Sequence, residues 1–141
     1  MVFAVWHADA AGIYSDESLE NMSGQTFLRG YRITDSSGAV TFKGVVPGWY
    51  SGRIIHIHVM IRTLGSSGSE FTEFTTKLFF DQTLINVRTT SVSPYRSRGR
   101  PDTTNAEVSI DIDSSSMQLT LANVTTGGGY AVSITLGVQI T

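Results

Sequence analysis

Apolar and small polar residues alternate along most of this 141-residue chain, a pattern typical of half-buried β-strands. Valine, isoleucine and threonine are frequent in these segments, and their branched side chains favour the pleated surface of a sheet. Glycine, serine, aspartate and proline separate the segments and suit tight turns. The pattern predicts strands at residues 2–6, 38–43, 53–62, 71–80, 108–112, 117–121 and 130–140.

One stretch favours a helix, because Asp81 can cap a short helical segment that ends before Pro94. Short strands separated by turns, with a single short helix, predict an all-β fold: an antiparallel β-sandwich with long loops. The length of the chain is typical of one domain, so we expect a single domain over residues 1–141.

Composition excludes several classes of partner and site. Charged residues make up 16% of the chain and the net charge is −2, so we expect no nucleic-acid partner. The chain has neither a long apolar run nor a basic amphipathic stretch, so we expect no association with membranes. Cysteine is absent, which excludes disulfides and thiolate-bound metals.

His56 and His58 are two residues apart within the predicted strand 53–62. Successive strand side chains point to opposite faces, so the two imidazoles share one face and Ile57 lies on the other. Two histidines about 7 Å apart along a strand can bind one metal ion. The pair alone is equally compatible with ordinary core or surface histidines.

Tyr14 and Tyr50 are the tyrosines in distinctive positions, the first just after the first strand and the second in a turn before His56. A phenol ionises near pH 10, so a tyrosinate at neutral pH needs a strong Lewis acid beside it. Its hard anionic oxygen suits iron(III) better than zinc or copper(I). Two tyrosines with two histidines therefore favour a ferric centre, although either tyrosine alone fits a core-edge residue with a hydrogen-bonded hydroxyl.

Four segments around these residues share their order and spacing with a known family. They are WHADAAGIYS at 6–15, FLRGYRITD at 27–35, GAVTFKGVVPGWYSGRIIHIHV at 38–59 and FTTKLFF at 74–80. Together they resemble the intradiol ring-cleavage dioxygenases, and most closely the small secreted and fungal-type members. The resemblance implies cleavage of catechol-type rings by O2 at a mononuclear non-haem Fe(III), with cis,cis-muconate-type products.

Carried onto this chain, the family pattern makes Tyr14 and Tyr50 the equatorial and axial tyrosinate ligands, and His56 and His58 the equatorial and axial histidines. Arg53 falls at the position of the family's substrate-facing arginine. A guanidinium there would stabilise the anion that develops on the ring. Tyr50 and Arg53 are therefore the expected catalytic residues.

Other substrate contacts are expected from Asp9, Trp49 and Lys77. Lys77 stands where relatives commonly have glutamine, and Phe79 stands where they have tyrosine. Lys77 either faces the site, where it would favour an acidic substituent, or points to solvent. Weaker expectations are an aromatic wall that includes Trp6 and Tyr95, a structural or exposed role for His7, and a mobile rim at residues 97–105.

The family's N-terminal portion and the dimerisation helices of its larger members have no counterpart in this sequence. We therefore expect that the start of the family domain is missing and that the protein is a monomer. Resemblance to small secreted members favours an extracellular location.

Two alternatives remain at this point. One is a β-sandwich binding module that has kept the scaffold and lost catalysis. The other is a copper or zinc protein that uses His56, His58 and a carboxylate such as that of Asp9. The presence of all four family ligands together with Arg53 favours the dioxygenase.

Overall fold

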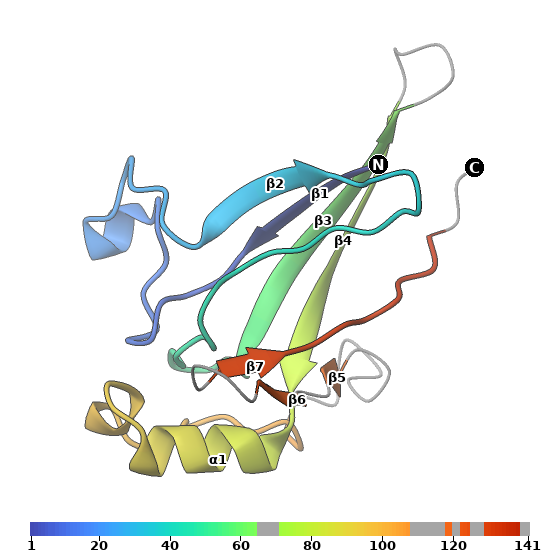
Figure 1. Ribbon diagram of the computed structural model, residues 1–141. Helices are drawn as coiled ribbons and strands as arrows, with labels where there is room; N and C mark the ends of the chain where they lie inside the picture. The colour runs from blue at the N-terminus through green and yellow to red at the C-terminus, as the bar shows by residue number, and fades with distance from the viewer. Residues whose placement is uncertain (65–70, 108–117, 120–121, 125–128, 139–141) are drawn as a thin grey trace.

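The computed structural model describes residues 1–64, 71–107, 118–119, 122–124 and 129–138 (Figure 1). A five-stranded sheet with the order β2-β1-β3-β4-β5 forms the centre of the molecule, and β6 pairs with β7 in a second, two-stranded sheet. Neighbouring strands are antiparallel, except that β4 and β5 are parallel. The strands are β1 (Val2–Trp6), β2 (Arg29–Ile33), β3 (His56–Leu64), β4 (Phe71–Phe80), β5 (Gln118–Leu119), β6 (Ala122–Val124) and β7 (Gly129–Ala131).

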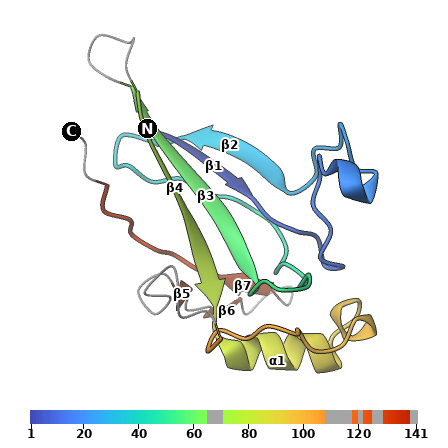
Figure 2. The same ribbon diagram turned by 180° about the vertical axis from the view of Figure 1, so that it is seen from behind.

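Helical structure in the described residues is limited to the 3-10 segments η1 (Ser18–Glu20) and η2 (Tyr95–Ser97) and the helix α1 (Gln82–Ser91). Helix α1 lies at one end of the sheet (Figures 1 and 2). The predicted class, an antiparallel β-sandwich with one short helix and long loops, is confirmed. None of the helices described here is long and apolar enough to cross a bilayer.

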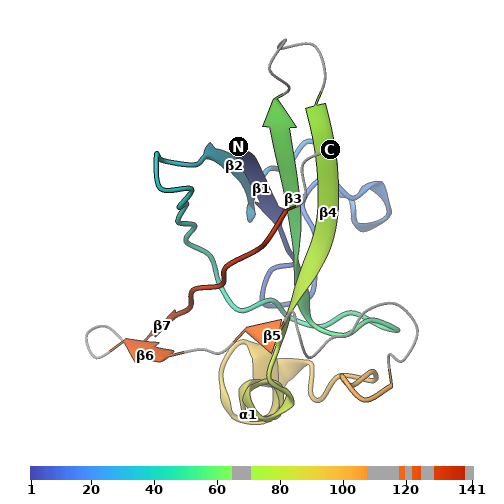
Figure 3. The same cartoon turned by 90° about the vertical axis from the view of Figure 1, so that its right-hand side faces the viewer.

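One face of the large sheet is covered mainly by chain without regular secondary structure. Residues 39–46 and 132–138 run along this side of the sheet (Figure 3). Val46, Leu136 and Val138 from these segments pack against the buried core. The second layer of the sandwich is thus formed partly by extended loops.

The predicted strand at 38–43 is wrong, since residues 39–50 form neither strand nor helix. Asp35 closes a turn by accepting hydrogen bonds from the amides of Ser37 and Ala39. The chain then crosses the core face, where Val46 packs, instead of adding a strand to the sheet. Strand β2 was not predicted because all its residues are exposed, and a strand without a buried face has no alternating pattern.

The other strand predictions differ mainly in their bounds. The predicted strand 53–62 begins later, at His56. Of the strand predicted at 130–140, residues 130 and 131 belong to β7, and the described residues 132–138 form no strand. Strand β5 lies within the predicted range 117–121. The strand predicted at 108–112 lies outside the described residues.

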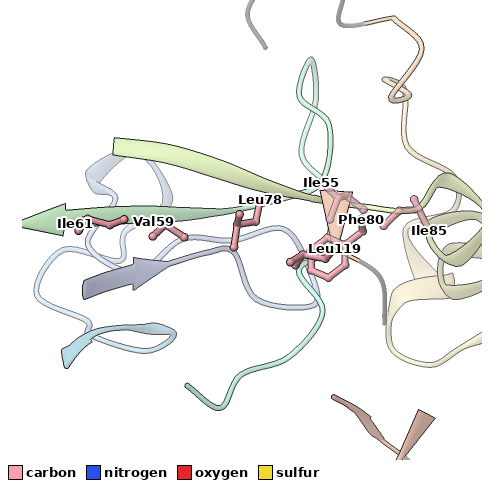
Figure 4. Packing of buried hydrophobic residues seen from close by; sticks show 7 residues of the cluster. All are labelled: Ile55, Val59, Ile61, Leu78, Phe80, Ile85 and Leu119. Atoms are coloured by element: carbon pink, nitrogen blue, oxygen red, sulfur yellow. The ribbon is translucent and has the colours of Figure 1, made fainter. Parts of the chain in front are cut away.

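Strand β3 presents different chemistry on its two faces. Val59 and Ile61 are 2% and 1% exposed and belong to the hydrophobic core. The alternation along the strand places His56 and His58 on the opposite face. The core cluster consists of Ile55, Val59, Ile61, Leu78, Phe80, Ile85 and Leu119 (Figure 4).

The prediction that Asp81 caps a short helix is confirmed. Its Oδ1 accepts hydrogen bonds from the amides of Thr83 (2.9 Å) and Leu84 (3.1 Å), two of the amides that have no partner within the helix. Ile85 and Thr89 are the buried residues of α1, and Ile85 joins it to the core at the end of the sheet.

Candidate metal centre

The start of β3 presents two imidazoles on the face of the sheet opposite the core. His56 is 3% exposed, and His58 pairs across the strands with Lys77 on one side and Trp6 on the other. The indole of Trp6 stacks on the His58 ring, with 4.7 Å between centroids and 3° between planes. This stacking restricts the rotation of the His58 ring.

Hydrogen bonding fixes the tautomer of His56. Its Nδ1 lies 2.6 Å from the carbonyl oxygen of Ile54. A carbonyl only accepts, so Nδ1 carries the proton and donates, and the lone pair is on Nε2. Such an outward hydrogen bond is how a metal-binding histidine is usually oriented.

Tyr14 ends a tightly closed loop that follows β1. The Asp9 carboxylate accepts hydrogen bonds through Oδ1 from the amides of Ala11 (2.8 Å) and Ile13 (2.9 Å). The amide of Tyr14 donates to Oε2 of Glu20 (3.1 Å). The backbone is therefore held at Ile13 and at Tyr14 itself, where the phenol leaves the loop.

Tyr50 lies in a segment without strand or helix, shortly before β3. The amide of Gly48 donates to the carbonyl of Asp9 (2.7 Å), which ties this segment to the loop that carries Tyr14. As a result, the rings of Tyr14 and Tyr50 meet edge to face, with 5.5 Å between centroids.

All four predicted ligand residues are brought together. Nε2 of His56 is 3.0 Å from Nε2 of His58 and 3.5 Å from the hydroxyl oxygen of Tyr14. The ring of Tyr50 lies 6.2 Å from that of His56, centroid to centroid. Two phenols and two imidazoles from three separate segments thus cluster together.

The pKa values of these groups are shifted toward their neutral forms. Burial, then the neighbouring His56 and Lys77, lowers the pKa of His58 to about 4. Burial also lowers the pKa of His56, and burial followed by the proximity of Tyr50 raises the pKa of Tyr14. Without a cation, the pocket therefore holds neutral imidazoles and a protonated Tyr14.

The donor set fits a hard, highly charged metal ion. Two phenols can both ionise in a buried site only beside a strong Lewis acid, and imidazole lone pairs complete such a set. Within the described ranges, no group of three or more His, Cys, Asp or Glu side chains could hold a metal. The Asp9 carboxylate is bound to its own loop, so a copper or zinc site built on it gains no support.

A cavity of about 350 Å³ is lined by three of the four candidate ligands, Tyr14, Tyr50 and His58. Tyr14 was predicted, but sequence reasoning missed Gly12, Glu17, Leu19 and Glu20, because these residues reach the site only through the course of a loop. The segment 27–35 contains Arg29, but nothing in its pattern pointed to a cavity. The lining residues are Trp6, Gly12, Tyr14, Glu17, Leu19, Glu20, Arg29, Tyr50 and His58.

Lys77 and Arg53 are the two cations whose charges affect the pKa values of the site histidines. Lys77 lies directly opposite His58 in the register of β3 and β4, so its side chain leaves the sheet on the face of the site. Its charge contributes to the lowered pKa of both His56 and His58. Arg53 is exposed, donates to the carbonyl of Gly52 (3.2 Å) and also contributes to the lowered pKa of His56.

Asp9 and Trp49 were predicted to contact substrate. Both make hydrogen bonds that hold loops in place, and neither lines the cavity. The indole Nε1 of Trp49 donates to the carbonyl of Gly99 (2.9 Å), and the guanidinium of Arg98 lies 4.6 Å from the indole centroid. Residues 97–105, predicted as a rim, therefore contact the Tyr50 segment directly. A substrate contact by Asp9 or Trp49 stays a prediction.

Two further candidates have structural roles. The hydroxyl of Tyr95 donates to the carbonyl of Val46 (2.7 Å), and its ring is buried away from the cavity lining. His7 is 6% exposed, and its Nδ1 lies 2.8 Å from the carbonyl oxygen of Ala8. The structural role expected for His7 is consistent with this burial.

No family model matches the sequence, and no curated protein is significantly similar to it. Among solved structures, an intradiol ring-cleavage dioxygenase from Tetranychus urticae is similar to this chain, with a TM-score of 0.72 and 27% sequence identity. The likeness covers 86% of this chain and 63% of that protein's chain. The resemblance read from the sequence is therefore confirmed in the fold, and this chain spans less than two thirds of that protein's length.

Proposed function

We propose that this chain, whose fold is similar to that of an intradiol ring-cleavage dioxygenase, cleaves catechol-type rings with O2 at a mononuclear iron(III). Tyr14, Tyr50, His56 and His58 would hold the iron, and the products would be of the cis,cis-muconate type. The observation that carries the proposal is the meeting of two phenols and two imidazoles, three of which line one cavity.

A ferric ion bound by these residues would supply a Lewis acid that accepts the catechol as its diolate and activates the ring toward O2. The protein's part is to arrange donors and protons around that position. Two neutral imidazoles with pKa values below the ordinary 6.5 need no deprotonation before binding at neutral pH. Hydrogen bonding to Ile54 already directs the free lone pair of His56 at Nε2.

Tyr14 and Tyr50 would each release a phenolic proton when the cation binds. The raised pKa of Tyr14 supports this view, because burial beside a second phenol makes a phenolate unfavourable without a compensating charge. The loop held by Asp9 and Glu20 would keep the Tyr14 hydroxyl near the histidines in both protonation states.

The substrate ring would enter the cavity beside Trp6, Tyr14 and Tyr50, which supply aromatic walls. Lys77, on the histidine face of β4, would stabilise the negative charge of the diolate or of an acidic substituent. Arg53 would do the same from the exposed turn before β3, after exchanging its hydrogen bond to Gly52 for one to the substrate.

The test combines metal analysis, visible absorption and oxygen uptake over a panel of catechol, protocatechuate and hydroxyquinol. Iron-loaded protein should contain one iron per chain, show a tyrosinate-to-iron charge-transfer colour and consume O2 with at least one of these compounds. We expect His56→Ala to lose iron, colour and activity together. Removal of an outer-shell partner typically lowers metal affinity by roughly 10- to 100-fold. Tyr50→Phe removes a proposed ligand, so its iron affinity should fall by at least as much.

Tyr31→Phe is the matched control, because Tyr31 is 73% exposed on β2 and lies outside the cavity lining. It should keep iron, colour and activity. A fully metallated but colourless protein would overturn the tyrosinate–iron assignment. A coloured protein that consumes no O2 with any catechol would favour the non-catalytic binding module instead.

A further inference from the structure

The turn that carries Tyr50 depends on a distant segment for its position. Residues 46–53 have no strand or helix of their own, so no ladder of backbone hydrogen bonds fixes them. Tyr50 is nevertheless expected to hold its phenol within a fraction of an ångström of one place. Besides the hydrogen bond from Gly48 to Asp9, the contacts that hold this segment come from residues 95–103, about fifty positions later in the chain.

Asp102 makes the contacts nearest to Tyr50. Its Oδ2 accepts from the hydroxyl of Ser51 (2.6 Å), and its Oδ1 accepts from the amide of Gly52 (3.1 Å). The hydroxyl of Thr103 also donates to Oδ1 (2.9 Å), which orients the carboxylate from its own side. These hydrogen bonds, that from Ser51 foremost, lower the pKa of Asp102.

Two neighbours of Asp102 hold the other side of the turn. The carbonyl of Gly99 accepts from the indole of Trp49, the residue directly before Tyr50. Arg98 packs over that indole and also donates through Nη1 to the carbonyl of Ala11 (2.6 Å), in the loop that carries Tyr14. The same short segment therefore touches both tyrosine-bearing loops.

We propose that Asp102 is a positioning residue, which sets the place of the Tyr50 phenol by fixing the backbone at Ser51 and Gly52. The Asp102 carboxylate is engaged by Ser51, Gly52 and Thr103, so it acts through the turn that carries Tyr50 and not on a substrate. The importance of this place for iron binding rests on the proposed function. The positioning itself is a property of the metal-free protein.

The test reports on Tyr50 directly by fluorine NMR of metal-free protein labelled with 3-fluorotyrosine. The chain has five tyrosines, and Tyr50→Phe identifies the Tyr50 signal. Asp102→Ala should shift or broaden that signal while the signal of exposed Tyr31 stays in place. In iron-loaded protein, the same variant should bind iron about 10-fold more weakly, as outer-shell changes commonly do.

Asp35→Ala is the matched control, because Asp35 closes a turn with the same chemistry elsewhere in the chain. Its Oδ1 accepts from the amides of Ser37 and Ala39 and from the hydroxyl of Ser37. This variant should lower the melting temperature to a degree similar to Asp102→Ala but leave the Tyr50 signal unchanged. Ser51→Ala removes only one of the three hydrogen bonds and serves if Asp102→Ala does not fold.

An unchanged Tyr50 signal in Asp102→Ala, or in Ser51→Ala where that variant decides, would overturn the positioning role whatever happens to thermal stability. Wild-type protein that binds no iron would instead contradict the proposed function. The fluorine comparison still decides the role of Asp102 in that case, because it needs no metal.

Discussion

Burial keeps the individual histidines of this protein neutral. The pKa values of His7, His56 and His58 are all lowered, with loss of solvation as the largest cause in each case. For the latter two, neutrality serves the proposed metal site. For His7, which is 6% exposed and hydrogen-bonded within the loop after β1, it makes folding sensitive to acid.

We predict that the metal-free protein loses stability as the pH falls below about 6.5, the ordinary pKa of histidine. The unfolded chain takes up protons there, whereas the buried imidazoles resist protonation, so the stability is full above this pH and lost below it. Urea unfolding at pH 7.5, 6 and 5 measures the effect. His7→Asn should show a shallower pH dependence, with His56 and His58 still contributing; an unchanged dependence would show that His7 contributes nothing.

At the level of elements, the site depends on how closely two loops approach each other. A Cβ placed on Gly12 would lie 2.0 Å from the carbonyl oxygen of Trp49, and Gly12 also has a φ of +84°, which L side chains rarely adopt. The loop carrying Tyr14 can therefore lie against the segment carrying Tyr50 only with glycine at this position. The short distance between the two tyrosine rings therefore depends on the close packing of these two backbone segments.

We predict that Gly12→Ala separates the two loops and weakens iron binding more than it weakens folding. The backbone contact cannot be relieved by rotation of a side chain, so the loops must move apart. Iron affinity and the charge-transfer colour measure the separation, and the melting temperature measures the fold. Gly30→Ala in β2 is the control, since a Cβ there meets nothing within 4 Å; equal iron affinity in the two variants would contradict the prediction.

On the scale of the whole molecule, the residues of the hydrophobic core and the candidate ligands lie on opposite faces of one sheet. The core lies on one face of β3, where Val59 and Ile61 are buried (Figure 4). The histidines lie on the other face, covered by the loops that carry the tyrosines. Changes on the core face should therefore alter the free energy of unfolding without moving the candidate ligands.

We predict that Ile61→Val lowers the free energy of unfolding by about 0.5–1.5 kcal/mol, the usual cost of removing one buried methylene. Iron content and colour should stay at the wild-type level. Chemical denaturation and metal analysis test the two statements together. Ile33→Val, at a residue 72% exposed on β2, should change stability by less than about 0.5 kcal/mol. Loss of iron in the folded Ile61→Val protein would show that the two faces are coupled.

The sequence by itself determined what depends on near neighbours. Alternation along the chain fixed the all-β class and placed His56 and His58 on one face, and a carboxylate before an apolar stretch fixed the start of α1. Resemblance to a family predicted that Tyr14 and Tyr50 are metal ligands together with the two histidines. Each of these inferences uses a local period, a local cap or an ordered set of motifs.

Only the tertiary structure decided where segments distant in sequence meet. The alternating residues 38–43 form no strand, and the same segment reaches the core only further on, where Val46 packs. Asp102 reaches the turn at Ser51 across some fifty residues, and no local pattern marks it. The contacts that hold the tyrosines together join loops that are distant in sequence. The packing of the whole chain sets the positions of these loops, and no periodicity in the sequence does so.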